Sequence, residues 1–181
     1  MKKLSVLLFA TVLTLTVNAQ KYQTKTGNIK FYSKTDKETI KAENRKVVSA
    51  IDSTTGALEF SLLMKAFDFT NDVMEQHFNE SYAESDKFPK ATFKGAISDR
   101  SKVNFSKDGT YKVNITGKLT IKDVTKDITT TATIVVKGGK ITATSQIKIK
   151  PKDYNFKIPA IAEKSIAEEL TVDIAMTYTK K

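Results

Sequence analysis

Hydrophobic and polar residues alternate with a period of two through most of the second half of the chain. Between Tyr111 and Ile121, apolar side chains fall on one face and Lys, Asn and Thr side chains on the other. The same alternation recurs over residues 127–136, 141–149 and 170–178. This pattern is typical of antiparallel strands that bury one face and expose the other. The second half is therefore predicted to consist of such strands.

A two-residue turn fixes the register of one predicted hairpin. Gly138 and Gly139 separate two alternating runs, which is a strong signal for a tight β-turn. A slip of one residue would move every apolar side chain to the opposite face. The in-phase pairs predicted from this turn are Val136 with Ile141, Ile134 with Ala143, Ala132 with Ser145, and Ile128 with Ile149.

Residues 107–109 form a second predicted turn. A two-residue loop would place Phe105 opposite Lys112, which is out of phase. A three-residue loop with Gly109 in the left-handed conformation keeps the apolar residues together. We therefore expect a hairpin that pairs Phe105 with Tyr111 and Val103 with Val113.

The first half is less regular and contains one predicted helix. A change of apolar phase between Met64 and Phe67 predicts a β-bulge. Residues 71–82 have helical spacing, with Asn71 or Asp72 as the cap and Glu75 completing a capping box with Asp72. Strands are expected at residues 29–31, 40–51, 58–64 and 91–97, and a long connection with one short helical turn near 161–167 is expected over residues 151–169.

These elements define an all-β protein of about eight strands with one helical insertion. Both a sandwich and a closed antiparallel barrel satisfy that count. Long strands and a mid-strand glycine, Gly117, favour the barrel, because such a glycine permits the strand to bend.

The N-terminal residues predict export. Lys2 and Lys3 precede an apolar run over residues 4–17, and small residues lead up to Ala19. This is the pattern of a cleaved secretory signal, so residues 1–19 are expected to be removed, leaving one domain over 20–181 in the periplasm or outside the cell. A retained anchor is the alternative, although the run is short for a membrane span. The sequence has no cysteine, so stability is expected to come from a hydrophobic core without disulfides.

The formal net charge is +10, yet only Arg45 and Arg100 among the 30 basic residues are arginine. Arginine supplies the forked geometry that grips phosphate and guanine, so nucleic acid is not an expected partner. A weak attraction to anionic membrane surfaces stays open, and so does a homodimer. Lysines on the predicted solvated face, where they also discourage edge association, are Lys112, Lys118, Lys140, Lys148 and Lys150.

Small residues on the inward faces indicate a hollow. An eight-stranded barrel is either filled by its own side chains or able to hold one small ligand. The alternative to a hollow is filling by Phe60, Phe67 or Phe93. Because the inward faces are almost wholly apolar, a bound ligand is expected to be hydrocarbon-like. The small inward residues are Ala91, Gly95, Gly117, Ala132, Ala143 and Ser145.

Catalytic chemistry is sparse. The absence of cysteine excludes thiolate sites, and a single histidine, His77, excludes two-histidine zinc motifs. Neither a G-x-S-x-G motif nor a glycine-rich phosphate loop occurs. His77 is interpreted as a packing residue on the predicted helix, with a role as a base or a headgroup contact as the alternative. No metal or cofactor is expected apart from a bound lipid.

Several segments together resemble the YceI-like family. Residues 74–80 and 84–95 carry the most specific part of the likeness, and residues 29–31, 109–111, 117–121, 124–126 and 152–154 follow in the family's order. The resemblance implies a lipocalin-like eight-stranded barrel, a periplasmic location, and binding of polyisoprenoid or quinone-like chains. Two positions depart from the family pattern: Asp123 replaces a glycine, and Tyr154-Asn155 replaces a Phe-Gly pair.

The resemblance also places Met74, His77, Phe78, Pro89 and Phe93 around the cavity. Combined with the inward faces, it gives a set of ligand-lining candidates: Phe31, Phe60, Phe67, Met74, His77, Phe78, Phe93, Ile115, Leu119, Ala132, Ile134, Ala143, Ile147 and Val172. No catalytic or metal-binding residue is predicted.

Three functions remain open at this stage. The first is an exported, non-catalytic carrier or sequestering protein that holds an isoprenoid-type chain inside the barrel. The second is a non-catalytic interaction or stress-protection module with a filled barrel. The third, and least favoured, is an enzyme that uses His77.

Overall fold

Strands dominate residues 21–181, the part of the chain that the computed structural model describes. The predicted signal segment, residues 1–19, lies outside these residues. The strands are β1 (Lys21–Lys34), β2 (Thr39–Asp52), β3 (Ala57–Leu63), β4 (Asp68–Phe69), β5 (Lys90–Ile97), β6 (Gly109–Ile121), β7 (Val124–Lys137), β8 (Lys140–Ile149) and β9 (Leu170–Lys180). The helical segments are η1 (Met64–Ala66), α1 (Asp72–His77), the π-helical η2 (Phe78–Tyr82), η3 (Arg100–Lys102) and η4 (Pro151–Tyr154).

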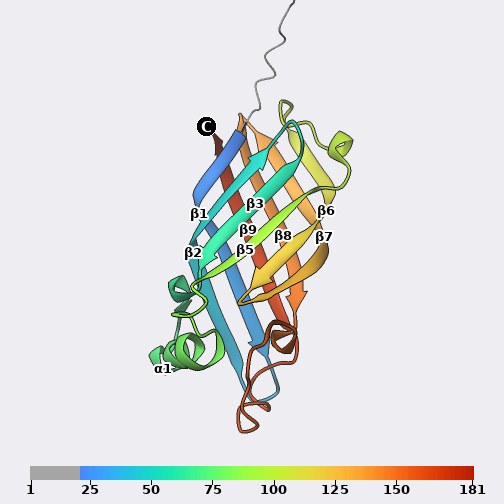
Figure 1. Cartoon of the computed structure of the whole chain (residues 1–181). Coiled ribbons are helices and arrows are strands. Elements are labelled where there is room, and N and C mark those ends of the chain that lie inside the picture. Colours follow the sequence, from blue (N-terminus) through green and yellow to red (C-terminus); the bar gives the residue numbers. More distant parts are fainter. Residues whose placement is uncertain (1–20) are drawn as a thin grey trace, which may run out of the picture.

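Eight of these strands close into an antiparallel barrel. They follow the order β1-β9-β8-β7-β6-β5-β3-β2, and pairing of β1 with β2 completes the circle. The two-residue β4 adds to the edge of β2. The closed barrel confirms the predicted fold class and decides against the sandwich. Figure 1 shows α1 and the connection after β8 at one end of the barrel and the C-terminus at the other.

The β7–β8 hairpin has the predicted register over most of its length. Gly138 and Gly139 adopt φ values of +56° and +75°, and the three pairs nearest the turn form as expected. The predicted pair of Ile128 with Ile149 is wrong, because the ladder ends at Ala132 and Ser145. Beyond that point, the Thr130 hydroxyl donates a hydrogen bond to the Gln146 carbonyl at 3.1 Å.

The predicted hairpin over residues 103–113 is also wrong. β6 pairs with β5, and the connection between them contains η3 and irregular turns. Val103 and Phe105 are buried because this connection packs at the barrel end that lies away from α1, where the Phe105 ring stacks on Tyr22 at 6.3 Å. The alternating apolar residues Val103 and Phe105 therefore belong to a connection that covers this end of the barrel and not to a strand. Gly109 begins β6 without a left-handed φ.

Residues 64–82 differ from the expectation in their details. The apolar phase changes through η1, a single 3₁₀ turn, where a bulge was expected. Asn71 caps α1 by accepting from the N–H groups of Val73 and Met74. Glu75 accepts from the Phe69 N–H at 3.2 Å, so it links α1 to β4 and does not complete a capping box with Asp72.

Two further sequence predictions concern the exposed lysines and the connection after β8. The five lysines assigned to the solvated face are exposed. The single helical turn predicted near residues 161–167 is present as one i→i+4 hydrogen bond, from the Ile166 N–H to the Ala162 carbonyl at 3.1 Å, within a run of turns that forms no regular helix. No helix within residues 21–181 is long and apolar enough to cross a membrane.

Candidate functional site

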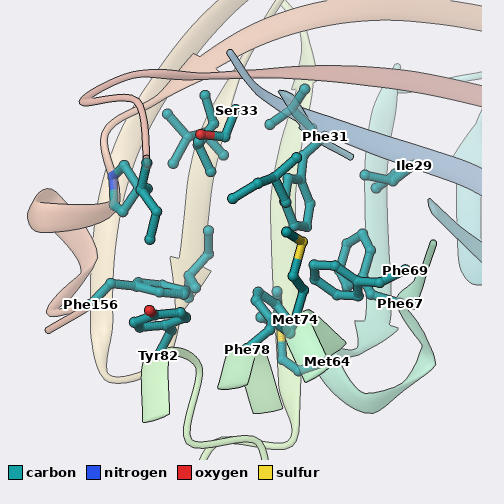
Figure 2. A pocket seen from close by; sticks show the side chains of 18 of the residues that line it. Ile29, Phe31, Ser33, Met64, Phe67, Phe69, Met74, Phe78, Tyr82 and Phe156 are labelled. Atoms are coloured by element: carbon teal, nitrogen blue, oxygen red, sulfur yellow. The ribbon is translucent and has the colours of Figure 1, made fainter. Parts of the chain in front are cut away.

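A half-open cavity of about 290 Å³ lies at the α1 end of the barrel. All of the eight barrel strands except β7 contribute to its lining, and β4, η1, α1, η2 and the connection between β8 and β9 complete it. The lining is aliphatic and aromatic apart from five side chains. Figure 2 shows part of this lining, including the rings of Phe31, Phe67 and Phe78. The five lining residues with polar side chains are Ser33, Glu38, His77, Tyr82 and Ser165.

Four phenylalanine rings form one wall of this cavity. Phe31 on β1 contacts Phe67, Phe69 and Phe78 with ring centroids 5.3, 5.7 and 5.8 Å apart. Phe69 and Phe78 also contact each other at 5.1 Å. The capped start of α1 places Phe78 on this cluster. Phe31 meets Phe67 and Phe69 edge-on, which is a favoured geometry for aromatic pairs, and the contacts of Phe78 with Phe31 and Phe69 are tilted. The wall is therefore preformed.

Two polar groups near the cavity have different roles. The Ser33 hydroxyl accepts a hydrogen bond from the Ala167 N–H at 2.8 Å, which holds the connection after β8 against β1. His77 is exposed, lies at the edge of the cavity, and makes no side-chain hydrogen bond within residues 21–181. This exposure contradicts the interpretation of His77 as a packing residue.

The predicted lining residues divide between two cavities. Nine line the main cavity: Phe31, Phe60, Phe67, Met74, His77, Phe78, Leu119, Ile147 and Val172. The other five line only a second cavity of about 60 Å³ deeper in the barrel: Phe93, Ile115, Ala132, Ile134 and Ala143. Of the small inward residues, Ala132, Ala143 and Ser145 line the smaller cavity. Ala91 lines the main cavity, and Gly95 and Gly117 line neither. Pro89 lines neither cavity; its carbonyl accepts from the Met64 N–H.

Sequence reasoning missed the contribution of residues 151–169. Pro151, Phe156, Ile158 and Ile166 from this connection line the main cavity. The signal was the presence of large apolar residues in a segment without strand alternation. Such residues need a buried surface elsewhere, and the barrel end supplies it.

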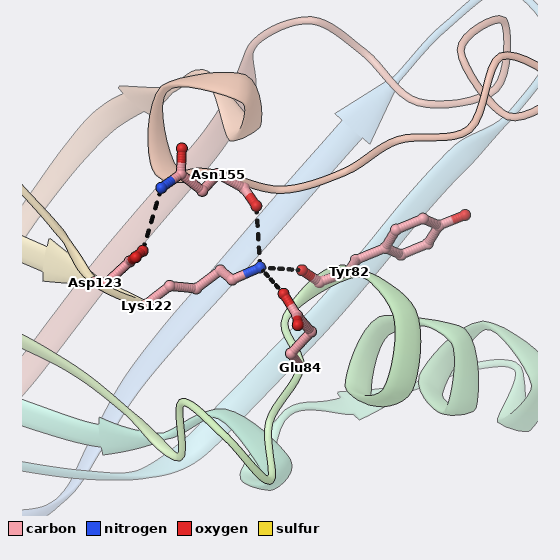
Figure 3. A network of polar contacts seen from close by, with 5 residues as sticks. All are labelled: Tyr82, Glu84, Lys122, Asp123 and Asn155. Atoms are coloured by element: carbon pink, nitrogen blue, oxygen red, sulfur yellow. Dashed lines mark hydrogen bonds and ion pairs between the residues drawn. The ribbon is translucent and has the colours of Figure 1, made fainter.

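A buried lysine ties the segments around this end together (Figure 3). The Lys122 side chain is 3% exposed, and its ammonium group pairs with the Glu84 carboxylate. It also donates to the carbonyls of Tyr82 at 3.3 Å and Asn155 at 3.0 Å. Its nitrogen lies 5.5 Å from the Phe156 ring centroid. Tyr82 and Phe156 both line the cavity, so this cation holds η2 and the connection after β8 beside the β6–β7 turn.

Three residues of this network have left-handed backbones. Glu84, Lys122 and Asn155 have φ values of +49°, +54° and +57°, and no other non-glycine residue within 21–181 has a positive φ. Such a conformation is costly for a side-chain-bearing residue. We call Glu84, Lys122 and Asn155 the clasp. One buried ammonium group joins the three positions: it belongs to Lys122, pairs with the Glu84 carboxylate and donates to the Asn155 carbonyl.

The two segments that depart from the YceI-like pattern contact each other at the clasp, through Asp123 and Asn155. The Asn155 side-chain amide donates to the Asp123 carboxylate at 3.2 Å. Asn155 takes the left-handed conformation expected of a glycine replacement, whereas at the β6–β7 turn Lys122 takes it and Asp123 does not. The bend therefore forms without a glycine at position 123.

Metal chemistry has no visible support among the described residues. Within 21–181, no three side chains of His, Asp or Glu gather in a way that could hold a metal ion. The arrangement is suited to apolar contacts, because few side chains of the lining can form hydrogen bonds.

Comparison with known proteins identifies one family. The model of the YceI-like domain matches residues 10–178. A search of curated proteins finds no match.

Solved structures share the barrel. A polyisoprenoid binding domain from Saccharophagus degradans, implicated in plant cell wall breakdown, has a TM-score of 0.77 at 15% identity, covering 90% of this chain and 99% of that one. Burkholderia cenocepacia BcnA has a TM-score of 0.70 at 22% identity, with 83% and 95% covered. The Campylobacter jejuni YCEI protein has a TM-score of 0.55 at 19% identity, with 100% and 99% covered. At these identities the likeness establishes the fold.

Proposed function

The chain belongs to the YceI-like domain family, and from that premise we propose that its main cavity holds the hydrocarbon chain of an isoprenoid lipid. The observation that carries the proposal is the apolar lining of a preformed cavity of about 290 Å³. A branched, flexible hydrocarbon can follow such a lining without requiring a charged partner. The solved polyisoprenoid binding domain with the same fold supports the choice of ligand class.

Burial of apolar surface supplies the binding energy. Each buried methylene group contributes about 0.8 kcal/mol, so an isoprene unit of five carbons contributes roughly 4 kcal/mol before the costs of association. The Phe31, Phe67, Phe69 and Phe78 wall is packed before the ligand enters, which reduces the ordering cost. A polar headgroup would stay at the edge of the cavity, near the exposed His77.

The protein acts in this proposal as a carrier or sequestering protein and performs no catalysis. The predicted signal at residues 1–19 supports a location outside the cytoplasm, in the periplasm. The alternative of an interaction module with a filled barrel is less well supported, because the barrel contains two cavities.

Native mass spectrometry tests this proposal. The full chain, expressed with its N-terminal segment and purified from the periplasm without detergent, is expected to carry a bound mass equal to that of an isoprenoid. Protein stripped of lipid should take up one molecule of farnesol and return it chemically unchanged. His77→Ala should behave in the same way. Failure of stripped protein to take up any isoprenoid would contradict the proposal, and conversion of farnesol that depends on His77 would favour the enzyme hypothesis.

A further inference from the structure

The two cavities lie in line along the barrel and share one layer of side chains. On β3, Leu62 lines the main cavity, Phe60 lines both, and Leu58 lines only the deeper one. β6, β8 and β9 show the same order: one residue lines only the main cavity, a second lines both cavities, and a third lines only the deeper cavity. We call the four residues that line both cavities the dividing layer: Phe60, Leu119, Ile147 and Ile174.

Phe60 is the bulkiest member of the dividing layer, and a ring on the side of the deeper cavity, Phe93, supports it. Its ring stacks on Phe93 with centroids 5.3 Å apart and planes 13° from parallel. Phe93 in turn packs directly on the paired glycines Gly95 and Gly117. A Cβ atom at Gly95 would lie 2.7 Å from the Phe93 ring, and one at Gly117 would lie 2.5 Å from it. The two glycines thus create the space for Phe93, and Phe93 supports Phe60.

From this arrangement we propose that Phe60 ends the ligand site and sets the length of isoprenoid chain that the protein prefers. The inference rests on the proposed function, because it concerns the same cavity. A chain that enters at the α1 end meets the Phe60 ring before it reaches the deeper cavity of about 60 Å³. The deeper cavity is apolar along most of its wall, so it is suited to hydrocarbon once the ring is removed.

Binding of isoprenoid alcohols of increasing length tests the role of Phe60. Dissociation constants for geraniol, farnesol, geranylgeraniol and solanesol are measured by competition with a fluorescent apolar probe. Phe60→Ala joins the two cavities, so a longer chain can bury additional methylene groups. The ratio of affinities of geranylgeraniol to farnesol is expected to rise roughly tenfold relative to the parent protein. Phe60→Leu, which preserves more of the packing, should give a smaller rise in the same direction.

Matched variants separate this effect from a general loosening of the barrel. Phe69→Ala and Phe69→Leu remove the same atoms from the main cavity only, so they should leave the length preference unchanged. Ala143→Leu places bulk in the deeper cavity, and adding it to Phe60→Leu should cancel the gain for longer chains.

The outcomes distinguish the two proposals. An unchanged length preference in both Phe60 variants, with farnesol still bound, overturns the role of Phe60 and leaves the proposed function standing. An equal shift in the Phe69 variants also overturns it. If the parent protein binds none of the alcohols, the proposed function is contradicted, and so is the proposal that Phe60 sets the preferred chain length.

Discussion

Replacement of Ala91 by phenylalanine is expected to weaken farnesol binding about a hundredfold, equivalent to about 2.7 kcal/mol. Ala91 is buried on β5 and lines the main cavity but not the deeper one. The added ring would occupy volume that the hydrocarbon chain needs and would remove on the order of 100 Å² of apolar contact. The effect is measured as the dissociation constant of farnesol for purified protein stripped of lipid.

Ala143→Phe is the matched control for this prediction. Ala143 lines only the deeper cavity, so the same substitution there should change the affinity for farnesol less than about threefold. Chemical denaturation of both variants reports any overpacking, which typically costs about 1–3 kcal/mol. Equal losses of affinity in the two variants, or unaltered binding in Ala91→Phe, would show that farnesol does not occupy the main cavity.

Lys122→Met is expected to lower the free energy of unfolding by about 3 kcal/mol. The substitution keeps much of the apolar stem but leaves the Tyr82 and Asn155 carbonyls without their donor. Loss of one partner from a buried polar network costs about 1–3 kcal/mol for each group left unsatisfied. The left-handed backbone at residue 122 would remain strained without the contacts that offset it. Urea denaturation followed by circular dichroism measures the change.

Lys118→Met provides a control on the neighbouring surface. Lys118 pairs with Asp127 at 2.9 Å, but both side chains are largely exposed. An exposed ion pair contributes about 0.2–1 kcal/mol, so this variant should lose far less stability than Lys122→Met. Comparable losses in the two variants would mean that the clasp does not hold the barrel end together.

The pH dependence of stability gives a second readout of the clasp. The hydrogen bond from Lys122 lowers the pKa of Glu84 below its ordinary value of 4.5. A carboxyl group whose pKa is lowered by folding stabilises the protein above its ordinary pKa. That contribution is lost as the pH falls through the lowered pKa of the folded state. Lys122→Met should therefore lose less stability on acidification than the parent protein, and an identical acid profile would argue against the pairing.

Much of the barrel follows from local patterns that the sequence displays directly. Alternation predicts the strands of the second half, and the Gly138-Gly139 turn predicts the register near it. Alternation gives a wrong prediction at Val103 and Phe105, because an alternating apolar pair is equally compatible with a strand and with an irregular connection packed over the barrel end. The outcome depends on whether β5 or the intervening segment pairs with β6, and local periodicity does not contain that information.

The sequence predicts the apolar lining of the site but not its division into two cavities. Inward-facing apolar positions identify residues that line a hollow, including Phe31, Leu119 and Val172. The division into two cavities depends on how Phe60 stacks on Phe93, which is a tertiary contact. Burial of Lys122 is equally invisible in the sequence, because its partners at positions 82, 84 and 155 come from distant segments.

A crystal structure of the protein grown with farnesol tests the central claim most directly. The account predicts continuous density for the hydrocarbon chain between the Phe31, Phe67, Phe69 and Phe78 wall and the Phe60 ring, with the hydroxyl group at the cavity edge near His77. Farnesol bound only on the outer surface, with side chains closing the main cavity, would contradict it.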